Sequence, residues 1–137
     1  MLLSLFTGRK PMHLLNVYSD AQHTAITWLS RNIARLPPVS YMGSDFNSYN
    51  AVWDDGVLHQ HWDSNLLVES AQLMGLDWAW PSNYGPIYYP HANSLRPSVI
   101  DLVFLEVHEV LHKQLHLLNE MRNTSDHVLI YHTATRP

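Results

Sequence analysis

Cysteine is absent from the sequence, basic residues are few, and long apolar runs are missing. Without cysteine the chain has no disulfide, no thiolate nucleophile and no cysteine-ligated metal site, a composition that fits an intracellular protein. Eight Lys and Arg stand against twelve Asp and Glu, for a formal charge of −4, which excludes a basic protein that coats nucleic acid nonspecifically. The longest apolar runs, such as Leu102–Leu105, are far shorter than the roughly 18 residues of a membrane span, so we expect no membrane association.

The remaining composition is that of a globular protein. Hydrophobic residues make up 46% and charged residues 15% of the 137 residues, enough apolar material to form a core. A chain of this length buries roughly two-thirds of its unfolded surface, so we expect one domain over residues 1–137. The acidic balance remains compatible with a nuclease, because metal ions can supply the positive charge that such a site needs.

Strands and helices are expected to alternate along the chain, which favours an α/β fold. We expect a helix with Ser19 or Asp20 as its N-cap, and a second helix that begins at a Ser64 cap and ends at Gly75. The segment 98–105 is apolar on both faces, so we expect a central strand that is covered on both sides. The other expected elements are strands at 2–7, 12–18, 39–42, 76–80, 87–89 and 127–132, with residues 106–120 ambiguous between helix and strand.

The first candidate site is the segment Asp45–Phe46–Asn47, just after an expected strand. If the chain stays extended, Asp45 and Asn47 point the same way while Phe46 points into the core. A carboxylate beside an amide suits phosphoryl transfer, because one can accept a proton while the other binds a phosphate oxygen. Asp and Asn are also common in ordinary strand-to-loop turns, so a purely structural role remains open.

A second candidate site involves Asp101, Asp126 and His127. Asp101 interrupts the most apolar strand, where an unpaired carboxylate would be costly. Pairing with an imidazole would satisfy it and fix the tautomer of the histidine. We therefore expect an Asp101–His127 dyad, with Asp126 available for a metal ion. The alternative is an Asp that caps a loop and a His that simply lies in a strand.

The segment His108–Glu109–Val110–Leu111–His112 matches the H-E-x-x-H pattern of zinc peptidases. On a helix the two histidines would bind zinc and Glu109 would act as the general base. The pattern is short, ten histidines favour a chance match, and the spacing to His116 differs from the longer zinc-peptidase form. A zinc peptidase is thus an alternative function. The purely structural interpretation of this segment is a stripe of solvent-exposed histidines.

Four motifs occur together in one order along the chain and resemble those of the endonuclease/exonuclease/phosphatase superfamily. They are most similar to the endonuclease domain of non-LTR retrotransposons of fungal type. The motifs are Asn16–Ser19, Gly43–Asn47 followed by Trp53–Asp54, Arg96–Phe104 and Ser125–His127. The resemblance implies a four-layered α/β sandwich that hydrolyses phosphodiester bonds in DNA with Mg²⁺ or Mn²⁺, inside the cell and in the nucleus.

The resemblance also implies roles for individual residues, matched motif by motif. Tyr18 would contact the scissile phosphate, Asp45 would orient or deprotonate the attacking water, and Asn47 would hold the phosphate. The remaining roles concern the second cluster: Asp101 would orient His127, His127 would stabilise the phosphate or transfer a proton, and Asp126 would bind the metal ion.

The chain departs from this family in two ways. The family's first strands carry an Asn and a metal-binding Glu, and residues 1–15 supply neither, so the resemblance covers the C-terminal part of the domain. We therefore expect a truncated domain with weak metal binding and impaired activity, or a non-catalytic remnant of a mobile element, with any reverse transcriptase downstream. A missing part of the sandwich would leave a sheet face uncovered and favour self-association. Ser44 also stands where the family usually has Gly.

Overall fold

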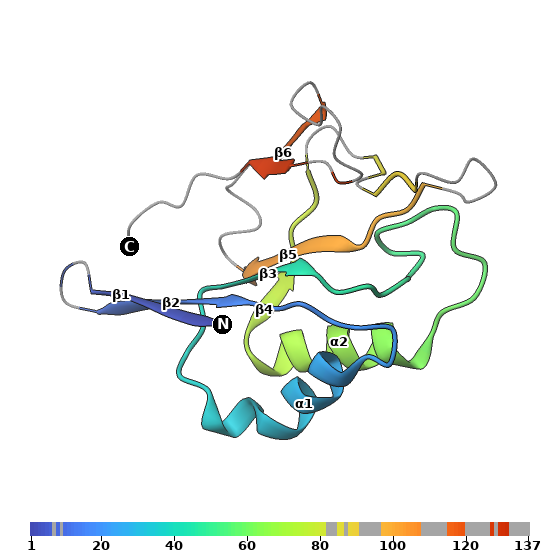
Figure 1. Cartoon of the computed structure of the whole chain (residues 1–137). Helices are drawn as coiled ribbons and strands as arrows, with labels where there is room; N and C mark the ends of the chain where they lie inside the picture. Colours follow the sequence, from blue (N-terminus) through green and yellow to red (C-terminus); the bar gives the residue numbers. More distant parts are fainter. Residues whose placement is uncertain are drawn as a thin grey trace.

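The structure is a computed structural model, and it describes residues 1–6, 8, 10–81, 85–86, 88–90, 97–107, 115–119, 127 and 129–131. These residues form a five-stranded sheet, two α-helices, a short 3₁₀ helix and a two-stranded sheet (Figure 1). The mixed α/β class is therefore confirmed. In chain order the elements are β1 (Leu2–Phe6), β2 (Pro11–Asn16), α1 (Thr24–Asn32), η1 (Ile33–Arg35), β3 (Tyr41–Asp45), α2 (Trp62–Leu73), β4 (Leu76–Trp78), β5 (Asp101–Glu106), β6 (His116–Leu118) and β7 (Leu129–Tyr131).

The five-stranded sheet has the order β1-β2-β3-β5-β4. β2 and β3 run parallel, and the other neighbouring pairs are antiparallel. β5 lies between β3 and β4, and its apolar residues Leu102 to Leu105 are at most 4% exposed. The expected central strand is therefore present, although it begins at Asp101, and Ser98 instead forms an isolated bridge with Tyr88.

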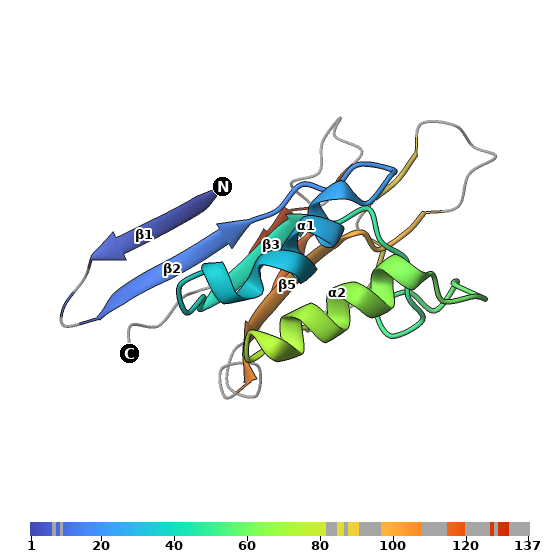
Figure 2. The ribbon, with the colours of Figure 1, turned by 90° about the horizontal axis from the view of Figure 1, so that it is seen from below.

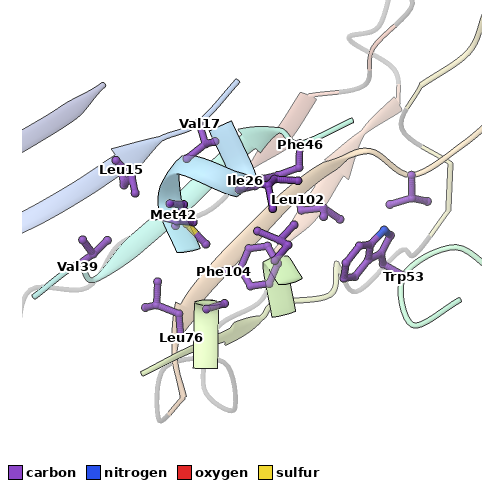
Figure 3. Close-up of a cluster of buried hydrophobic side chains, with 14 of the residues drawn as sticks. Leu15, Val17, Ile26, Val39, Met42, Phe46, Trp53, Leu76, Leu102 and Phe104 are labelled. Carbon is purple, nitrogen blue, oxygen red and sulfur yellow. The ribbon is translucent and has the colours of Figure 1, made fainter. Parts of the chain in front are cut away.

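The layers place helices on one side of this sheet and the small sheet on the other. Figure 1 shows α1 and α2 below the five-stranded sheet and β6 above it, and Figure 2 shows the helices in front of the sheet, with α2 running roughly along the strands. Between helices and sheet lies the larger core, whose labelled members are seen in Figure 3. Phe104 is its centre, because its ring meets Phe46 edge-on at 5.6 Å and Trp53 at 6.4 Å between centroids.

The two α-helices differ in how well their ends follow the local pattern. α1 buries Ile26 and Leu29, as the helical spacing predicts, but its N-cap is His23, so the expected cap at Ser19 or Asp20 is wrong. The Asp20 carboxylate nevertheless accepts hydrogen bonds from the backbone amide and the hydroxyl of Thr24. α2 begins at Trp62, so the expectation that Ser64 caps it is wrong. The Ser64 hydroxyl lies inside the first turn and donates to the carbonyl of His61 at 2.9 Å.

The expectation of self-association through an uncovered sheet face stays a prediction, and a separate observation concerns the apolar edge strand β1. Its large side chains are at least partly open to solvent, with Phe6 81% exposed. In the ambiguous segment 106–120, β6 is a strand at its far end, while residues 108–114 lie outside the described part of the chain. None of the described helices has the length and hydropathy needed to cross a membrane.

Candidate functional site

Asp45, Asp101 and His127 converge at one edge of the sheet. Asp45 ends β3 and Asp101 begins β5, and the two are direct partners in the antiparallel register. His127 lies just before β7, and one ligand atom from each of the three side chains falls within 4.8 Å of the others. Two carboxylates placed opposite each other repel unless a cation or proton lies between them. This half-buried group is therefore a candidate metal site.

A short hydrogen bond joins Asp101 to His127. The Nδ1 atom of His127 lies 2.5 Å from Oδ2 of Asp101, so the pairing expected from the buried carboxylate is present. Since a carboxylate only accepts, Nδ1 carries the proton and the tautomer of the ring is set. The Asp101 side chain is 17% exposed and that of His127 33%, so water reaches the imidazole more easily than the carboxylate.

Tyr88 supports His127 from a segment that the sequence predicts only as a short strand. Its backbone exchanges hydrogen bonds with Ser98 and forms an antiparallel bridge with His127. Its ring lies 5.0 Å from the imidazole between centroids. Tyr88 therefore ties the histidine to the segment that leads into Asp101, a contact that no local pattern in the sequence reveals.

The turn after β3 departs from the extended chain expected there. Phe46 points into the core as predicted and is fully buried. Asn47, however, has φ 46°, in the left-handed region that Asn tolerates better than most residues. The backbone amide of Asn47 donates to Oδ1 of Asp45 at 2.9 Å. The two residues therefore form a closed turn, and the chain is not extended there. Ser44 has φ 123°, which explains why glycine suits this position.

Tyr18 lies beside this turn, but its side chain lines a groove that is separate from the cluster of Asp45, Asp101 and His127. The amides of Val17 and Ser19 donate to the carbonyls of Gly43 and Asp45, so the chain continues alongside β3 after β2 ends. The Tyr18 side chain is 73% exposed and, together with Trp28 of α1, lines an open groove of about 440 Å³. The described geometry therefore does not place Tyr18 within the three-residue cluster.

Two predicted sites fall outside the described residues. Asp126, the expected metal ligand, is one of them, although His127 follows it directly in sequence. His108, Glu109 and His112 of the possible zinc-peptidase segment are the others. Both expectations stay predictions.

A buried polar group behind the turn was not predicted from the sequence. Ser48 donates to Asp63 of α2 at 2.7 Å, and Asn50 donates to the hydroxyl of Ser64 at 3.1 Å. Asp54 accepts from the amides of Gly56 and Val99. These contacts fasten the loop after β3 to α2 and to the segment before β5. Of Ser48, Asn50 and Asp54 in this loop, only Asp54 belongs to a motif singled out in the sequence, as part of the Trp53–Asp54 pair that follows the Gly43–Asn47 motif, and the motif predicts no structural role for it.

Comparison with solved structures shows a known fold that this chain resembles. No protein-family model and no curated protein matches the chain. A solved structure, the endonuclease domain of TRAS1, a telomere-specific non-LTR retrotransposon, is similar with a TM-score of 0.71 at 14% sequence identity. The similarity covers 99% of this chain and 64% of the TRAS1 chain. The chain therefore has the fold of a retrotransposon endonuclease domain over that part, as its motifs suggest.

Proposed function

We propose that the chain is a phosphodiesterase of the endonuclease type that cuts DNA with the help of Mg²⁺ or Mn²⁺. The observation that carries this proposal is the convergence of Asp45, Asp101 and His127, within 4.8 Å, in a fold similar to that of an endonuclease domain. Because its substrate is DNA, we propose that it acts inside the cell, in the nucleus.

The donor set fits a hard divalent cation. Mg²⁺ and Mn²⁺ prefer carboxylate oxygens and water, and often use one or two protein carboxylates. Asp45 and Asp101 offer such oxygens on partner positions of β3 and β5, and Asp126 is proposed as a further ligand. A bound cation would neutralise charge that develops on the phosphate and help to generate the attacking hydroxide.

The residues themselves would position and move protons. Asp45 orients or deprotonates the attacking water, and Asn47 holds the phosphate. A contact of Tyr18 with the phosphate is proposed from the motif resemblance alone, because Tyr18 lines a separate groove. Asp101 accepts a hydrogen bond from the Nδ1–H group of His127, which leaves Nε2 as the ring nitrogen that can face the substrate. When both ring nitrogens are protonated, Nε2 can donate a hydrogen bond to the phosphate or pass its proton to the leaving oxygen, whereas in the neutral tautomer with the proton on Nδ1 it can accept one.

A plasmid-nicking assay tests this proposal. Supercoiled DNA with Mg²⁺ or Mn²⁺ is incubated with the unmodified chain, with Asp45→Ala and with His127→Ala, while Asp77→Ala on β4 serves as an exposed carboxylate control. Each site variant should lower the nicking rate by at least about 100-fold, the scale of a lost general acid or base, and the control should not. Nicking that survives both site variants would remove the assignment.

The same assay separates the remaining readings of the chain. A weak rate that rises steeply with metal concentration is the result expected for an impaired enzyme. No nicking by the unmodified chain at any metal concentration would favour the non-catalytic remnant. The zinc-peptidase alternative depends on His108, Glu109 and His112, which lie outside the described residues, and it stays a prediction.

A further inference from the structure

The carboxylate of Asp63, in α2, is buried and contacts both the loop that follows Asn47 and the residue that precedes α1. Asp63, in the first turn of α2, is 1% exposed and accepts a hydrogen bond of 2.7 Å from the hydroxyl of Ser48, which is fully buried. Nδ1 of His23, from the loop before α1, lies 3.4 Å from the same Oδ2 atom. A buried carboxylate is costly unless polar groups surround it. Its placement here is explained if Asp63 holds Ser48 in position.

Ser48 is fixed through its main chain as well as through its side chain. The indole Nε1 of Trp53 donates to the carbonyl oxygen of Ser48 at 3.2 Å, and Trp53 is itself fully buried in the core. With the hydroxyl held by Asp63 and the carbonyl held by Trp53, Ser48 has little freedom to rotate.

The fixed Ser48 directly follows the strained residue of the site. Asn47 has φ 46°, a left-handed conformation that asparagine tolerates better than most residues but that still costs free energy unless contacts around it favour it. In this conformation the backbone amide of Asn47 donates a hydrogen bond to Oδ1 of Asp45 at 2.9 Å. If Ser48 were released, Asn47 could relax toward an ordinary conformation, and the hydrogen bond that orients the Asp45 carboxylate would be lost.

We propose that Ser48 and Asp63 are positioning residues, whose hydrogen bond locks the left-handed turn at Asn47 and so orients the Asp45 carboxylate. The catalytic consequence rests on the function proposed above, whereas the mechanical linkage does not. Neither residue touches the cluster of Asp45, Asp101 and His127 through its own side chain in the described contacts.

Two variants remove the hydrogen bond and two serve as controls. Ser48→Ala removes the donor, and Asp63→Leu removes the acceptor at similar volume. Asp63→Asn keeps an oxygen that can accept from Ser48 and should rescue the turn. The matched control is Ser64→Ala, because Ser64 is also a fully buried serine that bonds the same loop to the same helix, through Asn50.

Amide hydrogen exchange measured by NMR tests the linkage without any activity. In Ser48→Ala and Asp63→Leu the Asn47 amide should exchange at least about tenfold faster than in the unmodified chain, because local opening becomes easier. In Ser64→Ala and Asp63→Asn its rate should stay within about threefold of the unmodified chain. The Phe46 amide, which donates to the carbonyl of Ile100, should not change in any variant. Equal Asn47 exchange in Ser48→Ala and Ser64→Ala would overturn the inference.

Nicking kinetics test the consequence for catalysis. Ser48→Ala should lower kcat about 10- to 100-fold with little change in KM, since a displaced catalytic group lowers the rate of the chemical step. Ser64→Ala should retain kcat within about twofold. An unchanged kcat in Ser48→Ala would overturn the catalytic part of the inference. If the unmodified chain does not nick DNA, the proposed function fails, and the exchange experiment alone decides the linkage.

Discussion

Replacing Asp101 by Asn removes the negative charge that faces His127 while nearly keeping the shape of the side chain. The 2.5 Å contact between Asp101 Oδ2 and His127 Nδ1 is then lost or becomes a weaker, uncharged hydrogen bond. If the amide rotates, its NH₂ group meets the Nδ1 proton and the ring must change its tautomer. The substitution thus affects both the stability of the fold and the state of the histidine.

The size of the stability effect follows from the exposure of the pair. A hydrogen bond to a charged group contributes about 1.5–3 kcal/mol when it is shielded from water, and exposed ion pairs contribute about 0–1 kcal/mol. With the Asp101 side chain 17% and the His127 side chain 33% exposed, the pair lies between these cases. We therefore expect a coupling free energy of about 1–2 kcal/mol. At a urea slope of about 2 kcal/mol/M this shifts the unfolding midpoint by about 0.5–1 M.

A double-mutant cycle measures this coupling. Urea unfolding of the unmodified chain, Asp101→Asn, His127→Gln and the double variant gives the interaction term directly. As a control, Asp77→Asn removes an exposed carboxylate of β4 and should add to His127→Gln without coupling. If the effects of Asp101→Asn and His127→Gln add within about 0.3 kcal/mol, the hydrogen bond does not stabilise the fold and the reasoning is refuted.

Three other predictions concern the stability of the fold. Ser44→Gly should raise the free energy of unfolding by about 1 kcal/mol in urea titration, because φ 123° strains serine but not glycine. Hydrogen bonds from the backbone amide and the hydroxyl of Thr24 hold the pKa of Asp20 below its ordinary 3.8. The stability that they add is present above about pH 4 and is lost as the pH falls further. Asp20→Asn should therefore destabilise the chain at neutral pH and not in strong acid. Burial raises the pKa of the Tyr41 phenol above its ordinary 10.0; stability should therefore fall as the pH rises above about 10, and Tyr41→Phe should flatten this loss. A loss of equal steepness in Tyr41→Phe, or an unchanged midpoint in Ser44→Gly, would contradict these two expectations.

Local sequence patterns were sufficient where one periodicity decided the structure. Ile26 and Leu29 lie at helical spacing, and α1 buries both. The unbroken apolar run from Leu102 to Leu105 predicted a strand covered on both faces, and it lies inside the sheet. The α2 start was missed because the helix begins at Trp62, so that Ser64, a good cap by type, lies inside the first turn. There its hydroxyl accepts a hydrogen bond from Asn50, a contact that depends on the fold.

One part of the candidate site was predictable, because the free-energy cost of burying the Asp101 carboxylate implied a hydrogen-bond donor beside it. A carboxylate in an apolar strand needs a donor, and this argument led from Asp101 to His127. No such argument was available for Ser48 and Asp63, since serine in a loop and aspartate at a helix start are ordinary surface residues until the fold buries them. The turn at Asn47 was likewise hidden, because its left-handed conformation depends on contacts of the residues around it.

The hydrogen bond between Asp101 and His127 also connects two sheets. Asp101 begins β5 of the five-stranded sheet, while His127 lies two residues before β7 of the small sheet. A slip of one residue along a strand moves a side chain by about 3.3 Å, more than any hydrogen bond tolerates. The hydrogen bond between Asp101 and His127 therefore forms only when the two sheets pack in one relative register. The NMR signal of the Nδ1 proton of His127 would accordingly report on the assembly of the fold as well as on the chemistry of the site.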